Sequence, residues 1–170
     1  AAERIVLTYH NLHQIKSVCL RITNTFGPRH QMAHDEYGVF NWFIRKAMDN
    51  EIIPIFGDGR ILRDYLYIDD LTESMLAIAG SEKVYGEVYN IGSGVPLSFV
   101  DLAKKIIAIA GTGKVDYTEF TSERKALEPG DYYADISKIK AAIGWKPEIS
   151  LDDGIKRTIE YYKKYRSHYW

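Results

Sequence analysis

The stretch that decides the fold is Ile55-Phe56-Gly57-Asp58-Gly59-Arg60-Ile61-Leu62-Arg63-Asp64-Tyr65-Leu66-Tyr67-Ile68-Asp69-Asp70, in which turn residues separate two apolar runs. Glycine adopts positive φ without steric cost, and aspartate bonds its own backbone, so Gly57-Asp58-Gly59 predicts a turn. Two apolar runs around such a turn predict a hairpin. Alternation along the second run places Arg63 between tyrosine side chains and leaves Asp64 among leucine and isoleucine side chains.

Arg63 is the candidate binding residue of this stretch. A guanidinium held between aromatic rings suits bidentate contact with phosphate, and the rings offer flat walls to a sugar or base. The alternative is an ordinary surface pair between Arg63 and Asp64, because most charges on strands are only solvated. The carboxylates of Asp64, Asp69 and Asp70 are candidates for acid–base catalysis, yet a structural role is favoured. Either Asp69 or Asp70 is well placed to cap a helix that ends at Gly80.

The composition is that of a soluble chain with material for one core. It has 170 residues, of which 46% are hydrophobic and 26% charged. A net charge of -1 provides no field for nucleic acid or an anionic membrane, so any phosphate binding must be local. The single cysteine, Cys19, lies in an apolar run and indicates reduced thiols and a cytoplasmic location. Neither a bilayer-spanning run of roughly 20 apolar residues nor a signal peptide is recognisable.

Helices and strands alternate in the predicted order of elements, which indicates the α/β class. The expected helices cover residues 1–13, 37–48, 70–80, 98–111 and 135–144 and begin again at 150, and further strands cover 17–23, 86–92 and 114–120. The strands at 17–23 and 86–92 are nearly continuous apolar runs, as in parallel sheets buried on both faces. Residues 29–36 and 121–130 are expected to be loops.

Candidate ligand contacts lie where the strand over 17–23 stops. Ligands of open α/β sheets bind at the carboxyl ends of strands, which makes Thr23 and Asn24 candidates. Alternatively, Asn24 only bonds the backbone of the following turn. The His-x3-His pair His30 and His34 is predicted to bind no metal, because the segment lacks helical periodicity and a third ligand. The mixture of tyrosine and basic residues over 161–166 is better explained by a core edge and a solvated face than by nucleic-acid binding.

An ordered series of motifs covers nearly the whole chain. It comprises Ala2-Glu3-Arg4 with Tyr9, Arg21-Ile22-Thr23-Asn24-Thr25-Phe26-Gly27-Pro28, Phe56-Gly57-Asp58-Gly59, Arg63-Asp64-Tyr65-Leu66-Tyr67-Ile68-Asp69-Asp70, Tyr89-Asn90-Ile91-Gly92-Ser93-Gly94, Pro129-Gly130-Asp131, Ala134-Asp135-Ile136-Ser137-Lys138, Gly144-Trp145-Lys146-Pro147 and Gly154. In this order the motifs resemble the C-terminal half of the NAD-dependent nucleotide-sugar epimerase/dehydratase family, the UDP-glucose 4-epimerase-like extended short-chain dehydrogenases.

The resemblance implies a fold and a set of contacts. The fold is the C-terminal remainder of a Rossmann-type parallel sheet, over 1–27 and 71–92, plus a small mixed α/β substrate-binding subdomain over 28–70 and 93–170. For the substrate, a nucleotide-diphosphate sugar, the implied contacts are Asn24 and Arg63 to the diphosphate, Ile55 and Phe56 to the base, and Asp131 to the ribose. Ile22 and Thr23 resemble the residues that pass the nicotinamide end of the cofactor.

The chain departs from the family pattern at two places. Many members carry arginine directly before Pro-Gly-Asp, where this chain has Glu128, so either Arg124 or Lys125 substitutes or nucleotide binding is weaker or different. The Gly-rich turn that seats NAD and the catalytic Tyr-x3-Lys pair would both stand upstream of Ala1. No catalytic residue is therefore assigned, and the chain alone is expected to bind no NAD and to be inactive, whereas the complete family member uses NAD.

The function predicted is the nucleotide-sugar-binding portion of an NAD-dependent sugar-nucleotide epimerase or dehydratase. Two alternatives remain open: a stand-alone, non-catalytic nucleotide-sugar binder or scaffold, and one chain of a split oxidoreductase. A homodimer or other self-associated state is expected, because an apolar sheet edge and the apolar stripe of the first helix would otherwise stay uncovered.

Overall fold

Seven short strands form three small sheets in the computed structural model, which describes residues 1–34 and 38–170 but not the side chain of Arg124. The strands are β1 (Cys19–Ile22), β2 (Asn24–Phe26), β3 (Ile52–Phe56), β4 (Leu62–Tyr67), β5 (Val88–Ile91), β6 (Pro96–Ser98) and β7 (Lys114–Thr118). β1 pairs with β5 and β3 with β7, both in parallel, while β4 lies between parallel β2 and antiparallel β6. The α/β class with parallel pairing is confirmed.

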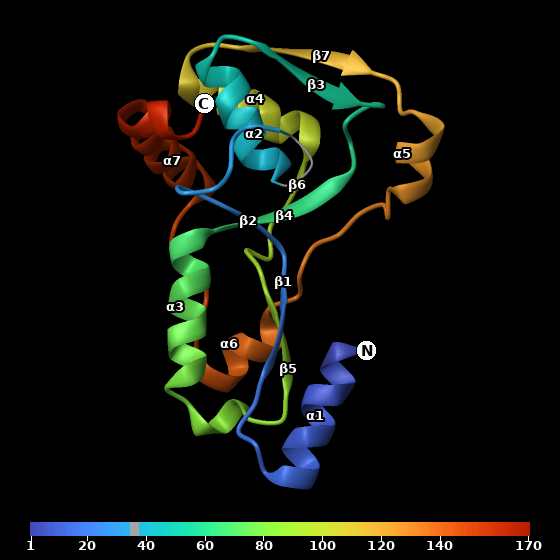
Figure 1. The fold of residues 1–170 in the computed structure, drawn as a ribbon, viewed down its shortest axis with the longest axis vertical. Helices are drawn as coiled ribbons and strands as arrows, with labels where there is room; N and C mark the ends of the chain where they lie inside the picture. The colour runs from blue at the N-terminus through green and yellow to red at the C-terminus, as the bar shows by residue number, and fades with distance from the viewer. Residues whose placement is uncertain (35–37) are drawn as a thin grey trace.

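The helices surround these sheets in two groups (Figure 1). They are α1 (Ala2–His13), α2 (Val39–Met48), α3 (Ile68–Ala79), α4 (Phe99–Ala110), α5 (Ser122–Leu127), α6 (Ser137–Ile143) and α7 (Leu151–Tyr165), with short 3₁₀ turns at Glu82–Val84 and Arg166–His168. In the view of Figure 1, α1, α3 and α6 lie beside β1 and β5 in the lower part, and α2, α4, α5 and α7 surround the upper strands. None of the helices in the described ranges is long and apolar enough to cross a membrane.

Strand β4 contributes to two hydrophobic cores from its two faces. Leu66 packs with residues of α3, β5 and α6 in the lower core. Tyr65 and Tyr67 pack in the upper core with Phe26 and Phe40, whose rings stack at 3.9 Å between centroids. The alternation of side chains along β4 is therefore confirmed, because period-two geometry sends neighbouring residues into different cores.

The predicted hairpin over residues 55–70 is wrong, although its turn forms. Gly57 and Gly59 have φ of 63° and 68°, and the Asp58 carboxylate accepts the backbone N–H of Arg60. The strands on either side of the turn then separate, since β3 pairs with β7 and β4 pairs with β2 and β6. A turn fixes the chain direction locally, but each strand here finds its partner far along the sequence.

The strand expected to stop at Asn24 continues after a break as a second strand. β1 follows β5 up to Ile22, the backbone N–H of Thr23 still donates to Ile91, and β2 then pairs with β4 from Asn24 onward. The expectation of burial on both faces is also wrong for the C-terminal half of β1, because Arg21 and Ile22 are exposed in this chain. Arg21 forms an ion pair with Glu3 of α1.

Most helix predictions agree with the structure. The buried faces of α2, α4 and α7 carry the expected apolar residues, and Ser98 and Ser150 cap α4 and α7 as predicted. The expected start of α2 at Tyr37 and the end of the preceding loop at Glu36 lie outside the described residues. Residues 121–130 were expected to be loop but contain α5. The side chain of Met75 in α3 is exposed instead of buried.

Asp70 does not cap α3, and neither does Asp69, because the N-cap of α3 is Tyr67 and carries no side-chain cap. Instead the buried carboxylate of Asp70 accepts the backbone N–H groups of Glu148 and Ile149 at 3.0 Å each. It thereby fixes the segment that leads into α7. Asp70 therefore has a structural role, as favoured from the sequence, but it binds a distant segment of the chain and does not cap α3.

Asp64 holds three segments together from the middle of β4. Its fully buried carboxylate accepts the backbone N–H and hydroxyl of Ser93 at 2.7 and 2.6 Å, and the N–H groups of Gly94 and Ala134 at 3.1 Å each. Only glycine fits at position 92, since a Cβ there would lie 2.4 Å from the carboxylate. Asp64 is thus paired with backbone groups and not with Arg63.

Replacing Asp64 with Ala should lower the free energy of unfolding by about 3 kcal/mol or more, because four donors lose a buried, charged acceptor. Urea denaturation followed by circular dichroism measures this change. Asp58→Ala is the matched control, since its side chain is 71% exposed, and it should cost less than about 1 kcal/mol. Equal midpoints for the two variants would contradict the role assigned to Asp64.

Candidate functional site

Arg63 is buried at the start of β4, where its guanidinium meets the segment that follows α5. Nη1 donates to the carbonyl of Leu62 at 2.9 Å and to the carbonyl of Gly130 at 2.5 Å, while Nη2 donates to the carboxylate of Glu128. The guanidinium also lies over the ring of Phe99, 5.4 Å from its centroid. It is therefore held between a carboxylate, two carbonyls and one ring, not displayed between tyrosine rings as the sequence predicted.

This arrangement differs from the two surroundings expected for Arg63, the display between tyrosine rings and the surface pair with Asp64. The Tyr65 and Tyr67 rings turn into the upper core, where they meet Phe40 and Phe26 edge-on at 5.1 and 5.5 Å. The expected Arg63–Asp64 pair is absent among the described contacts, since Asp64 faces the opposite side of β4.

Arg63 and Asn24 line the same cleft, which we call the polar cleft. It has a volume of about 430 Å³ and is lined by Thr23, Asn24, Thr25, His30, Gly38, Val39, Phe40, Arg63, Tyr65 and Phe99. Asn24 and Arg63 come together because β2 and β4 pair in parallel with Asn24 opposite Tyr65. An amide and a guanidinium on neighbouring strands suit an oxyanion such as a phosphate group.

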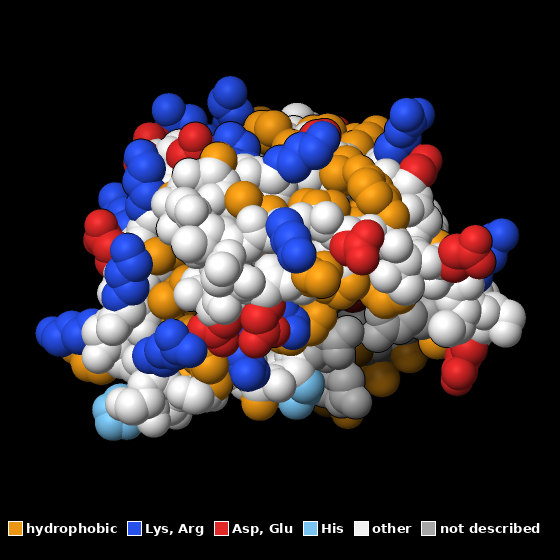
Figure 2. Space-filling view, turned by 90° about the horizontal axis from the view of Figure 1, so that it is seen from above, with side chains coloured by type: hydrophobic (Ala, Val, Ile, Leu, Met, Phe, Trp, Pro, Cys, Tyr) orange, Lys and Arg blue, Asp and Glu red, His pale blue; other side chains and the backbone are white. Residues whose placement is uncertain are grey.

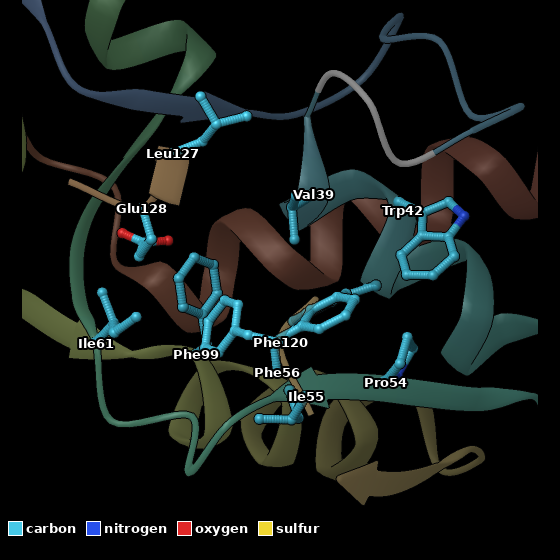
Figure 3. A pocket seen from close by; sticks show the side chains of 11 residues that line it. Val39, Trp42, Pro54, Ile55, Phe56, Ile61, Phe99, Phe120, Leu127 and Glu128 are labelled. Carbon is cyan, nitrogen blue, oxygen red and sulfur yellow. The ribbon is translucent and has the colours of Figure 1, made fainter. Parts of the chain in front are cut away.

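A second cleft of about 290 Å³ adjoins it, and we call it the aromatic cleft. Figure 3 shows Trp42 and Pro54 at one end, Ile61 and Glu128 at the other, and the rings of Phe56, Phe99 and Phe120 between them. Val39 and Phe99 line both clefts, so the two are neighbours. Flat rings beside a cationic cleft favour a ligand with one planar aromatic end and one anionic end.

Side chains of both charges are mixed on the face of the molecule that Figure 2 shows. Figure 2 shows lysine and arginine side chains interspersed with acidic and hydrophobic ones over the face seen from above. The net charge of the chain is -1. Recognition of an anion must therefore rest on the few groups inside the clefts and not on a long-range field.

The structure brings most of the predicted site residues to the two clefts. Ile55 and Phe56 both line the aromatic cleft, although Ile55 is only 1% exposed and so forms its floor. Thr23 lines the polar cleft, whereas Ile22 lies just outside it with an exposed side chain. Asp131 is exposed, and its Oδ1 accepts the backbone N–H of Leu62 at 2.8 Å, which leaves Oδ2 for other contacts.

Sequence reasoning did not assign several aromatic residues to the site, among them Trp42, Phe99 and Phe120. Trp42 was hidden because it lies on the partly exposed flank of α2, beside Phe43. Phe99 looked like an ordinary core residue at the start of α4, and Phe120 reaches the cleft only because β7 pairs with β3. A local sequence pattern cannot predict that an aromatic residue lines a site when only the pairing of distant strands brings it there.

Of the two residues proposed to replace the missing arginine, only Lys125 has a side chain that the structure describes, and Lys125 lines neither cleft. Lys125 is exposed on α5, and its backbone N–H donates to Thr121. The side chain of Arg124 lies outside what the structure describes. Glu128 itself lies at the junction of the two clefts and binds Arg63.

Tyr65 and Thr23 carry buried hydroxyls that have no hydrogen-bond partner within the described residues. Burial raises the pKa of the Tyr65 phenol, and Coulombic interaction with Arg63 lowers it by less. The phenol therefore stays protonated at neutral pH. It can donate a hydrogen bond but is no substitute for a general base.

No group of three or more histidine, cysteine or acidic residues in 1–34 and 38–170 is arranged to hold a metal ion. His30 interacts with Tyr162, since its backbone N–H and carbonyl both bond the phenol, and its ring Nδ1 lies 2.7 Å from the carbonyl of Gln31. The absence of a metal at His30 and His34 stays a prediction.

The comparisons with known proteins identify the family. The family model described as GDP-mannose 4,6 dehydratase matches residues 1–158. The chain belongs to this family. This confirms the resemblance to NAD-dependent nucleotide-sugar epimerases and dehydratases, and the α/β fold matches the C-terminal half of these Rossmann-like enzymes.

Several of the similar proteins are named for reactions of nucleotide sugars. The low-salt glycan biosynthesis protein Agl12 of Haloferax volcanii is 37% identical over 95% of this chain and 49% of its own length. The UDP-glucose 4-epimerase of Mycolicibacterium smegmatis is 32% identical over 96% of this chain and 50% of its own. The structure of the Thermotoga maritima UDP-glucose 4-epimerase with UDP-glucose superposes with a TM-score of 0.86 at 32% identity, over 96% of this chain and 51% of that one. The chain thus spans about half the length of the relatives it matches.

Protein purified without chelators should contain far less than one equivalent of zinc, nickel or copper per chain, because His30 and His34 lack a third ligand. Plasma emission spectrometry of dialysed protein measures the content. His30→Ala, His34→Ala double-variant protein supplies the background value. Stoichiometric metal in the unmodified chain, lost from the variant, would overturn this prediction.

Proposed function

We propose that residues 1–170 form the nucleotide-sugar-binding part of an NAD-dependent sugar-nucleotide epimerase or dehydratase. The observation that carries this proposal is the junction of the polar and aromatic clefts at Arg63, Phe99 and Glu128. A nucleoside diphosphate has a planar base at one end and two phosphates at the other. The aromatic cleft suits the planar base, and the neighbouring polar cleft suits the two phosphates.

In this proposal the base lies in the aromatic cleft against the rings of Phe56 and Phe120, which contact each other at 5.6 Å between centroids, and above the floor at Ile55. The diphosphate lies in the polar cleft against Asn24 and Arg63. Asp131 keeps the proposed contact to the ribose through its second carboxylate oxygen. The sugar would then extend toward Thr23 and the phenol of Tyr65.

The cofactor of the complete protein is proposed to be NAD, which supplies a hydride acceptor when bound. The structure of the Bacillus cereus UDP-glucuronic acid 4-epimerase, 29% identical to this chain, is a complex with UDP-glucuronic acid and NAD. The residues at the end of β1 fit a bound NAD. The side chain of Ile22 is exposed there, and the hydroxyl of Thr23 has no hydrogen-bond partner among the described residues. These two residues would pack against and hydrogen-bond the nicotinamide end.

Replacing Arg63 with Ala in protein that contains residues 1–170 should weaken binding of UDP-glucose and dTDP-glucose by about 2 kcal/mol or more. The reason is the loss of a largely desolvated guanidinium opposite a doubly charged group. Isothermal titration calorimetry measures the change.

Arg60→Ala is the matched control, because Arg60 lies in the adjacent turn with a side chain 84% exposed. Its affinity for both ligands should equal that of the unmodified protein. Unchanged affinity in the Arg63 variant, with its folding verified by circular dichroism, would remove Arg63 from the diphosphate site.

The 170-residue chain by itself should neither oxidise nor epimerise a nucleotide sugar. Its sequence holds no Tyr-x3-Lys pair and no Gly-x-Gly-x-x-Gly turn, and the buried Tyr65 phenol is not a base at neutral pH. Incubation with NAD and UDP-glucose, monitored at 340 nm and by chromatography for epimers, tests this. Turnover would mean that the catalytic residues lie within these 170 positions.

The same sample tests the proposed self-association. Ile5, Tyr9 and Leu12 form a stripe on α1 with side chains 59%, 53% and 71% exposed, and none of the helix's residues is buried. Light scattering should report a dimer or larger species. Binding of UDP-glucose without turnover fits both the binding part of a longer enzyme and a stand-alone binder, and the coding sequence upstream of Ala1 separates the two.

A further inference from the structure

Glu128 binds the group that the proposed function assigns to the diphosphate. Its carboxylate accepts from Nη2 of Arg63, and the two side chains are only 22% and 10% exposed. Nη1 is directed at the carbonyls of Leu62 and Gly130, so among the described contacts the N–H of Nε and the second hydrogen of Nη2 are left for a ligand. A carboxylate therefore stands beside the donors that an anionic ligand of Arg63 would use.

The backbone of the following turn holds this carboxylate in place. Oε1 of Glu128, the atom that pairs with Arg63, also accepts the backbone N–H of Gly130 at 3.1 Å. Gly130 has φ of 81°, a backbone conformation that favours glycine. The position of the carboxylate is thus built into the turn and is not the chance orientation of a free surface glutamate.

Glu128 also brings negative charge into the aromatic cleft. It is the single ionisable side chain among the described residues that line this cleft, whose other members are apolar or aromatic (Figure 3). Charges in such a poorly hydrated environment interact more strongly than in water. A phosphate that approaches Arg63 must therefore displace Glu128 or accept repulsion from it.

Resting on the proposed function, we propose that Glu128 is a specificity-determining residue that competes with the ligand's phosphate groups for Arg63. The competition lowers the affinity of the site for phosphate-bearing ligands and leaves the contribution of the nucleoside untouched. Unmodified protein should consequently discriminate between a nucleoside and its diphosphate less strongly than a variant without the carboxylate.

Two probes separate the phosphate from the nucleoside: UDP carries both, and uridine carries only the base and ribose. Glu128→Gln keeps the size of the side chain and removes its charge. It should bind UDP at least tenfold more tightly than the unmodified protein, while the affinity for uridine changes by less than twofold. Glu123→Gln, an exposed glutamate of α5, is the matched control and should leave both affinities unchanged.

Titration calorimetry at one ionic strength measures all six affinities, with circular dichroism to verify folding. Glu128→Ala provides a second variant should the amide disturb the turn, and it should show the same gain for UDP. Equal UDP affinities in the unmodified protein and in both folded variants overturn the inference while the proposed function stands. Should none of the proteins bind UDP, the proposed function fails and the inference fails with it. A gain that is equal for uridine and UDP also overturns it, because the effect would then not act on phosphate.

Discussion

The buried carboxylate of Asp64 is the constraint on which the rest of the structure depends. An isolated charge in the interior is prohibitively costly, so its four donors from Ser93, Gly94 and Ala134 must arrive together. Those donors belong to the loop after β5 and to the segment before α6. Their convergence fixes β4, and a fixed β4 presents Arg63 to the clefts on its other side.

The sequence was sufficient for features that depend on local chemistry. The caps of α4 and α7 at Ser98 and Ser150, the apolar face of α2 and the turn at Asp58 all follow from spacing and side-chain type. The motif series was sufficient for the family, since the matching model covers residues 1–158. The line-up of Asn24 and Arg63 in one cleft was also expected from it, though only through the resemblance.

The features that the sequence did not reveal depend on pairing between distant segments. A hairpin between β3 and β4 was the simplest arrangement for two apolar segments on either side of a turn. In the structure β3 pairs with β7 instead, and β4 pairs with β2 and β6. Likewise Asp70 had the position of a helix cap but bonds Glu148 and Ile149. Glu128 was visible as an unusual residue, but its contact with Arg63 required the return of residues 128–130 alongside β4.

The pairing of β3 with β7 has a consequence for biosynthesis. β3 is complete at Phe56, whereas its partner begins only at Lys114. During translation β3 therefore leaves the ribosome long before β7, as an apolar strand with an open edge, and closing so long a loop is slow. Until then the edge is a template for non-native pairing with other chains. The aromatic cleft also forms late, because Phe120, Leu127 and Glu128 of its lining follow β7 in the sequence.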